Sequence, residues 1–390
     1  MWSNQASALV SLVSWLFASK ILPETPMSCL AASRTLEQLV SCLDTFTVPH
    51  NYYNHVTYEL AQPNALQREA WVETVSLLLS VDGNCSTVVL PDALQGLYTV
   101  AVFQEDFNSY CVLVEHSLGC GFKYYKGWGF MVVPSTRSAI SRSIHLSAPH
   151  PKYDLGTVEQ AATLFKSTGA HSLLVAGRIR TAFLQSSDCV VPSGKGQYYK
   201  TDPAHNNLEP FVDASLAIHA WQSAHGGCPS STCAYIQIHG KGTRLIRIVG
   251  NSTSSQEWYT SPVDHPIKRL KTELQLAFPM WNVSLPSDSP CILTATKNVI
   301  GRYVNGVPLS DVCTTSARSR SAKGEFVHIE QASVSRNAGS YDAWGRALRE
   351  TFETSCVKGM QADPKTQMSL IAVTIPVFLS AYPVTCSISV

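Results

Sequence analysis

The sequence predicts an α/β fold within a single domain. Two observations predict it: a strand, loop, helix and strand follow one another over residues 144–180, and short β-branched and aromatic runs precede them. The composition allows a large core, because 45% of the 390 residues are hydrophobic and only 15% are charged. We expect a domain over 21–360, with its core at about 90–350.

The part of the chain before residue 144 is expected to add strands to the same sheet. Residues 65–79 place apolar side chains at helical spacing, and a shorter helix is expected at 35–43. Polar turns separate three strand-like runs, at 98–103, 110–115 and 128–133. We interpret these runs as an N-terminal, strand-rich elaboration, with no domain boundary between them and the segment that follows.

The segment 144–180 is predicted to be a βαβ unit. Alternating apolar residues open it as a strand, and Thr157 with Gln160 forms a Thr-x-x-Gln capping-box pattern at the start of a helix. Gly169 is expected to end that helix before the next strand at 172–176. In such units the loops at the carboxyl ends of the strands hold the ligands.

The remaining chain predicts further helices and strands around a long polar loop. The loop spans 185–210, and loops of this length in compact domains are usually functional or disordered. Helices are expected at 211–222, 264–276 and 342–351, and strands at 235–239, 245–249 and 325–330.

Cysteines and sequons favour a secretory route. The chain has 12 scattered cysteines and no C-x-x-C spacing, which disfavours a zinc ribbon and favours disulfides; Cys228 and Cys233 are candidates for a local bridge. Asn84, Asn251 and Asn282 lie in Asn-x-Ser/Thr sequons. We therefore expect a secreted or cell-surface protein.

Both ends of the chain bear on the same question. Residues 8–18 are an apolar run of signal-peptide length, so 1–20 is a candidate signal peptide, although no Lys or Arg precedes the run and a buried helix is the alternative. Residues 366–390 carry no charge. The tail at 361–390 is therefore a candidate membrane or lipid-anchor signal, with a buried terminal strand as the alternative.

The charge distribution argues against nucleic acid as a partner. The net charge is +1, and no stripe of Lys and Arg with interleaved aromatic residues is present. The counterion release that drives binding to a phosphate backbone would therefore be small.

Polar residues at strand ends predict a metal site. His150 lies between two prolines after the first strand of the βαβ unit, Asp154 follows four residues later, and His239 ends the 235–239 strand. Two imidazoles and one carboxylate are the ligand set of an open catalytic zinc, which brings the pKa of a bound water near neutrality. Glu330, at another strand end, is the candidate general base.

Three further residues are candidates for substrate binding. Arg180 and Arg336 could bind a substrate carboxylate or phosphate through two hydrogen bonds each. His205 lies in the long polar loop, where it either reaches the substrate or is an exposed loop residue.

Each site residue also has a structural interpretation. His150 could cap its loop, and His239 could form hydrogen bonds at the sheet end. Asp154 could be the Asx-turn residue of the following helix, and Glu330 could pair with Arg336. Three histidines in or beside strands are interpreted as structural: His145, His171 and His328.

Three motifs resemble poly-γ-glutamate hydrolases. APHPKYDLGTVEQA is similar to their H-x(n)-E/D-x-G-T-x-E-x-A segment, IQIHG to the strand that carries their second zinc histidine, and HIEQASVSR to their strand-end glutamate and following arginine. The resemblance covers roughly residues 90–350 and is concentrated in the three motifs. The region before residue 130 and residues 180–230 match nothing in that family, so substrate specificity does not transfer. One departure is that Asp154 stands one residue nearer to His150 than the family's glutamate does.

The resemblance implies a zinc-carboxypeptidase-like α/β fold, with a mixed, twisted sheet flanked by helices, and hydrolysis of an amide bond by a zinc-activated water. It implies His150, Asp154 and His239 as Zn²⁺ ligands and Glu330 as the general base. The expected substrate is a small or polymeric γ-glutamyl or peptide-like amide that carries a carboxylate. Two alternatives stay open, a zinc-dependent deacylase on the same frame and a catalytically silent, disulfide-bonded surface binding protein, and metal content separates the second from the enzymes.

Overall fold

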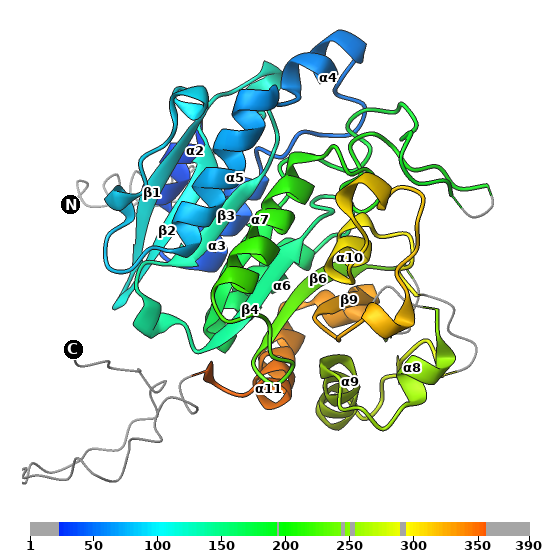
Figure 1. Cartoon of the computed structure of the whole chain (residues 1–390). Coiled ribbons are helices and arrows are strands. Elements are labelled where there is room, and N and C mark those ends of the chain that lie inside the picture. The colour runs from blue at the N-terminus through cyan, green and yellow to red at the C-terminus, as the bar shows by residue number, and fades with distance from the viewer. Residues whose placement is uncertain (1–22, 193–194, 243–245, 250–253, 289–293, 356–390) are drawn as a thin grey trace, which may run out of the picture.

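In a computed structural model of the protein, a mixed nine-stranded sheet lies between two layers of helices (Figure 1). The structure describes residues 23–192, 195–242, 246–249, 254–288 and 294–355. The predictions for the signal peptide, the C-terminal tail and the sequon at Asn251 lie outside these residues.

The centre of the sheet is parallel and its edges are antiparallel. The strand order is β1-β2-β3-β5-β4-β6-β9-β7-β8, in which β5, β4, β6 and β9 run parallel to one another. The carboxyl ends of these four strands therefore meet at one edge of the sheet. The strands are β1 (Tyr98–Glu105), β2 (Asn108–Glu115), β3 (Phe130–Pro134), β4 (Arg142–Ala148), β5 (Ala170–Val175), β6 (Cys233–Gly240), β7 (Ile246–Val249), β8 (Val283–Ser284) and β9 (Phe326–Gln331).

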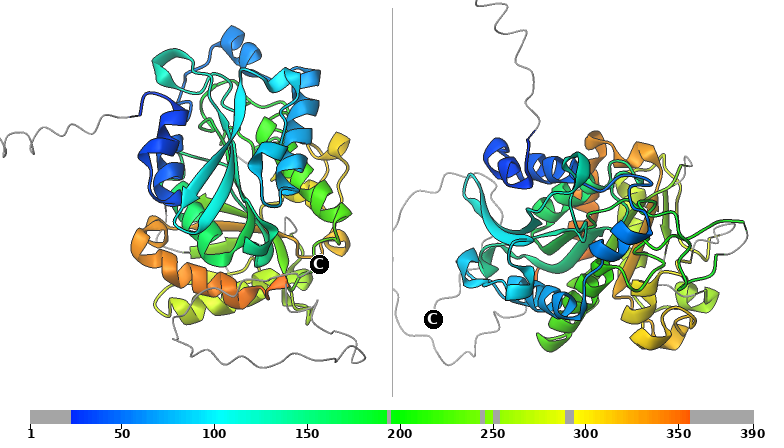
Figure 2. Two further views of the ribbon diagram at one scale, coloured as in Figure 1. Left: turned by 90° about the vertical axis from the view of Figure 1, so that its left-hand side faces the viewer. Right: turned by 90° about the horizontal axis from the view of Figure 1, so that it is seen from above.

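Helices cover both faces of the sheet, because its central strands carry apolar residues on both sides. One layer contains α3 (Leu36–Asp44), α6 (Thr157–Thr168), α9 (Pro266–Ala277) and α11 (Tyr341–Thr351), and the other contains α5 (Ala65–Leu79), α7 (Pro210–Ala224) and α10 (Val299–Val304). Figure 2 shows α3 and α5 on opposite sides of the twisted strands. Shorter α-helices are α2 (Pro26–Ala32), α4 (His55–Ala61) and α8 (Gln256–Thr260). Single 3₁₀ turns lie at Cys85–Thr87, Asp92–Leu94, Cys120–Phe122, Arg137–Ala139, Leu309–Asp311, Ser319–Ser321, Ser333–Arg336 and Ala338–Ser340.

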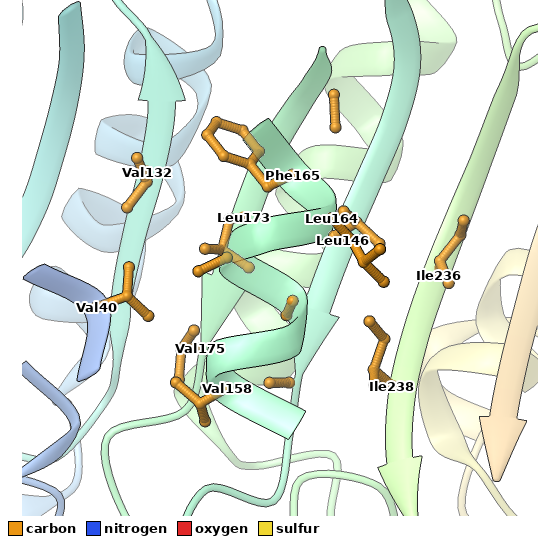
Figure 3. Close-up of a cluster of buried hydrophobic side chains, with 14 of the residues drawn as sticks. Val40, Val132, Leu146, Val158, Leu164, Phe165, Leu173, Val175, Ile236 and Ile238 are labelled. Carbon is orange, nitrogen blue, oxygen red and sulfur yellow. The ribbon is translucent and has the colours of Figure 1, made fainter. Parts of the chain in front are cut away.

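The βαβ unit forms the middle of the core. Phe165 and Val158 of α6 pack on Leu146 of β4 and Leu173 of β5, all within one buried cluster (Figure 3). Leu174, the next residue along β5, faces the opposite cluster under α5 and α7. The sheet is thus buried on both faces, and polar groups are placed mainly where its strands end.

The predicted α/β fold, with a mixed sheet flanked by helices, is confirmed. Every helix and strand predicted from residue 35 onward is present, with boundaries that differ by a few residues. The predicted capping box is wrong. The helix starts after Gly156, whose φ of 85° no β-carbon-bearing residue adopts easily, and Thr157 instead donates its hydroxyl to the Asp154 carbonyl. The side chain of Gln160 bonds Gln331 and the Ser335 carbonyl.

The expectation of disulfides is confirmed for eight described cysteines, including the local bridge. The pairs are Cys29–Cys42, Cys85–Cys111, Cys189–Cys313 and Cys228–Cys233, and Cys120 is an exposed free thiol. Four disulfides are typical of a protein from an oxidising compartment. The sequon asparagines Asn84 and Asn282 are exposed. In the part of the chain that is described, no helix combines the length and the apolar character needed to cross a membrane.

Candidate metal centre

The candidate site lies at the carboxyl edge of the parallel strands, where the chain changes direction across the sheet. From β4 the chain passes through α6 to β5 on one side, and β6 later pairs with the other side of β4. Such a switch point leaves a crevice outside the strand ends, which is where open α/β sheets bind ligands. His150 follows β4, Arg180 follows β5, His239 ends β6 and Glu330 ends β9.

A tight turn after β4 brings Asp154 back onto His150. The Asp154 amide donates to the His150 carbonyl at 2.9 Å, and Lys152 between them adopts a left-handed φ of 59°. As a result Asp154 Oδ2 lies 3.1 Å from His150 Nδ1. Asp154 also forms the turn that starts α6, since its carbonyl accepts from Thr157. The Asx-turn interpretation, in which the side chain would accept from the backbone, is therefore not the arrangement found, and the Asp154 side chain faces the two histidines.

Three ligand atoms converge between His150, Asp154 and His239. His239 Nδ1 lies 3.1 Å from His150 Nδ1 and 3.5 Å from Asp154 Oδ2. All three side chains are buried, with at most 5% of each exposed. Zinc–ligand bonds of about 2.0–2.1 Å at tetrahedral angles put neighbouring ligand atoms about 3.3 Å apart. The three atoms thus have the spacing of one face of a zinc tetrahedron.

The outer nitrogens of both imidazoles are engaged as donors. His150 Nε2 lies 3.0 Å from Asp202 Oδ1, a carboxylate that can only accept. His239 Nε2 lies 3.2 Å from Gln237 Oε1, which also accepts from the Asn298 amide at 2.7 Å. In each neutral ring the proton is therefore on Nε2, and Nδ1 presents a lone pair to the centre.

Two lone pairs and a carboxylate that face one another require a cation or a shared proton between them. Burial disfavours ionisation of Asp154, but its hydrogen bonds with His150 and His239 hold the pKa of this carboxyl well below its usual range. Burial and the nearby His328 lower the pKa of His239 to about 3. Burial and Arg180 oppose protonation of His150, yet its bonds to Asp154 and Asp202 raise its pKa. The donor set is thus anionic, with one imidazole held neutral, and it fits Zn²⁺.

Asp202 connects three positively polarised groups beside the centre. Its Oδ1 contacts His150, and its Oδ2 contacts His205 Nδ1 at 3.0 Å and the guanidinium of Arg180. The side chain is fully buried, and burial is outweighed by His205 and Arg180, which hold the pKa of Asp202 well below its usual range. Asp202 lies in the 185–210 loop. The only sequence signal for it was the Asp-Pro step before His205.

The predicted substrate-binding residues all lie near the centre, but each already has a protein partner. Arg180 bonds Asp202 and lies 5.2 Å from the ring centroid of Tyr153. His205 stacks on Tyr198 with a centroid separation of 3.6 Å. Arg336 donates to the carbonyls of Leu155 and Ala332, and packs so closely on Gly240 that a β-carbon there would lie 2.3 Å from its guanidinium.

Glu330 stands beside the triad in direct register with His239. The two residues are cross-strand partners in the parallel pair β6/β9. The carboxylate accepts from His328 Nε2 at 3.3 Å, while Arg336 donates to backbone carbonyls. The alternative of a Glu330–Arg336 ion pair is therefore not the arrangement found. His328, which the sequence analysis treated as structural, is its neighbour.

Comparison with known proteins finds distant structural similarity. No protein-family model matches the sequence, and no curated protein matches it. A succinylglutamate desuccinylase from Vibrio parahaemolyticus is 15% identical over 65% of this chain and 77% of its own, with a TM-score of 0.33. A candidate carboxypeptidase A from Shewanella denitrificans is 10% identical over 67% of this chain and 78% of its own, with a TM-score of 0.31. At these identities and TM-scores the likeness carries no argument about the site, so what the site can do follows from its own geometry.

Proposed function

We propose that the protein is a zinc-dependent hydrolase that cleaves an amide bond in a substrate bearing a carboxylate. The observation that carries this proposal is the convergence of His150 Nδ1, His239 Nδ1 and Asp154 Oδ2, three buried electron-pair donors within 3.5 Å of one another. Without a cation or a shared proton, that arrangement would cost free energy, because three buried lone pairs would face one another without a partner.

His150, Asp154 and His239 would hold the metal, and Asp202 and Gln237 would fix the orientation of the two imidazoles. Zinc bound there supplies Lewis-acid chemistry, which lowers the pKa of a water toward neutrality and polarises a carbonyl. Three protein ligands leave a coordination position for water or substrate, as catalytic zinc sites require.

Glu330 is the proposed general base. Burial opposes its ionisation, but the hydrogen bond from His328 lowers its pKa, so it is an anion at neutral pH. It would accept a proton from the attacking water and return that proton to the leaving nitrogen as the C–N bond breaks. Such a role needs a carboxylate close to the metal ligands, and the pairing of Glu330 with His239 across β6 and β9 supports it.

Arg336 supports a substrate that carries a carboxylate, whereas Arg180 is paired with the Asp202 carboxylate. The Arg336 guanidinium donates to the carbonyl of Leu155, the residue after Asp154, which supports a place for it near the metal ligands. Arg336 makes its hydrogen bonds only to backbone carbonyls among the contacts described, so its positive charge is not cancelled by a bonded carboxylate. A γ-glutamyl or peptidyl amide with a free carboxylate meets this requirement.

Metal content tests the first part of the proposal. We expect about one zinc per chain in purified protein and loss of that zinc in His239→Ala, because two remaining protein ligands compete poorly with water. Elemental analysis after zinc exposure and dialysis measures both. His225→Ala, which removes an exposed histidine elsewhere, is the matched control and should keep the metal. Wild-type protein without zinc would refute the site.

Turnover tests the second part. Glu330→Gln keeps the shape and should keep the zinc, but removes the proton acceptor, so hydrolysis of a γ-glutamyl or peptidyl amide should fall about 10²-fold or more. If turnover and zinc were both unchanged, Glu330 would not be the base. Loss of both would make it a metal ligand instead. A zinc-loaded wild type that turns over no amide would leave the binding-protein alternative.

A further inference from the structure

Four polar side chains form a cluster on one face of the paired strands β6 and β9. Gln237 pairs with His328 across the two strands, and His239 pairs with Glu330 two residues further on. Cross-strand partners and residues two apart point to the same face of a sheet. His328 therefore shares its surroundings with a metal ligand, with the amide that orients this ligand and with the proposed base.

Among the described residues, His328 makes one polar contact and two ring contacts, of which the longer is with Phe326 at a centroid separation of 6.2 Å. Its Nε2 lies 3.3 Å from Glu330 Oε1, and its ring stacks on that of His239 with centroids 4.1 Å apart and planes at 27°. The residue is only 6% exposed, and its buried Nδ1 has no hydrogen-bond partner among the residues that the structure describes. A proton on Nδ1 would be a buried, unsatisfied donor, which is rarer and costlier than an unsatisfied acceptor. The proton is therefore on Nε2, directed at Glu330.

We propose that His328 is a positioning residue for Glu330. Its Nε2–H anchors Oε1 of the carboxylate, and its ring is held in place by the stack on His239. The anchored carboxylate keeps Oε2 as the acceptor for the proton of the attacking water. This inference rests on the proposed function of Glu330 as general base.

Glu330 needs a positioning residue because a glutamate side chain has several rotatable bonds. Glu330 stands at the end of its strand and is part-exposed, with 22% of its side chain accessible. Such a side chain would otherwise populate several rotamers, and a displacement of about 1 Å at a reacting group can cost about 10²-fold in rate. One hydrogen bond from a buried, stacked ring removes that freedom without adding a charge to the site.

A pair of substitutions separates the hydrogen bond from the packing. His328→Phe keeps a ring on His239 but has no donor, so kcat should fall roughly 10- to 100-fold with KM, zinc content and Tm near those of the wild type. His328→Gln places an amide donor near the position of Nε2 and should recover part of kcat. Equal kcat in His328→Phe and wild type would overturn the proposal, as would a Phe variant no less active than the Gln variant.

The dependence on Glu330 gives a second test. In a Glu330→Gln background, His328→Phe should cause no further loss of kcat, because the group that it positions is no longer a base. If the two losses multiply instead, His328 acts by another route and the proposal fails.

The position of the His328 proton can be measured without turnover, so this test of the positioning role does not depend on the proposed function. In ¹⁵N-histidine-labelled protein, NMR should find the His328 proton on Nε2, and its exchange with water should accelerate in Glu330→Ala. A proton on Nδ1, or exchange that Glu330→Ala leaves unchanged, would overturn the positioning role even in an active enzyme. Conversely, if the wild type were inactive but the His328 proton were on Nε2, the proposed hydrolase function would be refuted. The hydrogen bond from His328 to Glu330 would still be supported.

Discussion

Asp202 connects His150 to Arg180 and His205, although no sequence motif singles it out. It is fully buried, yet it contacts His150, Arg180 and His205, and also accepts from the Ala204 amide at 3.1 Å. A buried carboxylate is tolerated only when its lone pairs are satisfied, and here each oxygen has two partners. Asp202 therefore fixes the ring of one metal ligand and neutralises a guanidinium beside it.

Asp202→Asn should weaken zinc binding by about 10- to 100-fold, the usual cost of losing the carboxylate behind a metal-bound histidine. It also leaves Arg180 without its charge partner. Zinc affinity is measured by competition with a chromogenic chelator. Asp188→Asn is the control, because Asp188 lies in the same loop with a side chain that is 88% exposed, and its variant should bind zinc as the wild type does. Equal affinities in the two variants would remove Asp202 from the site.

At the level of single residues, sequence patterns predicted the metal-binding candidates but missed the residues that support them. His150 and His239 were found because they end strands, and Asp154 because of its spacing from His150. Asp202 lies in an irregular loop with no periodicity. Gln237 and His328 lie inside strands, where alternation alone cannot separate a polar core residue from a site residue. Their contacts depend on the pairing of β6 with β9, strands that are distant in sequence.

At the level of elements, strong local signals predicted the helices and strands well, and tertiary contacts decided the rest. In the helix at 65–79 and in the βαβ unit, apolar residues recur at a clear spacing and turn residues mark the ends. Local sequence preference and tertiary packing therefore favour the same structure. The short helices α2, α4, α8 and α10 have at most seven residues each, which is too few to show a helical period in the sequence. The capping box failed because Gly156 makes a close approach to Arg336, at 3.0 Å from a β-carbon position to the Arg336 carbonyl oxygen.

The Cys189–Cys313 disulfide ties the loop that carries Asp202 to a segment 124 residues later. Chain entropy predicts that closing such a loop stabilises the fold by about 5 kcal/mol, against about 2 kcal/mol for the five-residue separation of Cys228–Cys233. We therefore expect the double variant Cys189→Ser/Cys313→Ser to lose the larger share of the free energy of unfolding. Denaturant unfolding of both double variants measures the difference. Equal losses would show that strain or residual unfolded-state structure outweighs loop length.

The whole molecule combines two populations of histidine at opposite ends of the same parallel strands. Near the carboxyl edge lie the histidines of the candidate site. Toward the other end, His145 contacts Ser172 and Gln222 at 2.8 and 3.1 Å, and His171 contacts the Leu79 carbonyl at 3.2 Å. This second group is buried without any carboxylate contact among the described residues, so it resists protonation for reasons unrelated to metal.

Stability should fall as the pH falls below neutrality, in part through these two residues. Burial first, and then neighbouring positive groups, lower the pKa of His145 to about 3 and that of His171 to about 4. In the unfolded chain both titrate near 6.5, so between that pH and about 4 the unfolded state binds more protons. In this range each histidine lowers the free energy of unfolding by about 1.4 kcal/mol for every unit by which the pH falls.

His171→Gln isolates this contribution, because the amide can still donate to the Leu79 carbonyl but does not titrate. Between pH 6.5 and 4.5 the variant should lose less free energy of unfolding than the wild type, by about 2–3 kcal/mol, as measured by urea denaturation at several pH values. The carboxylates of Asp154 and Asp202, whose pKa values lie below their usual range, lose their stabilisation at still lower pH and leave this window clear. Parallel pH profiles for variant and wild type would show that His171 takes up its proton in the folded state, and so is not held neutral by burial.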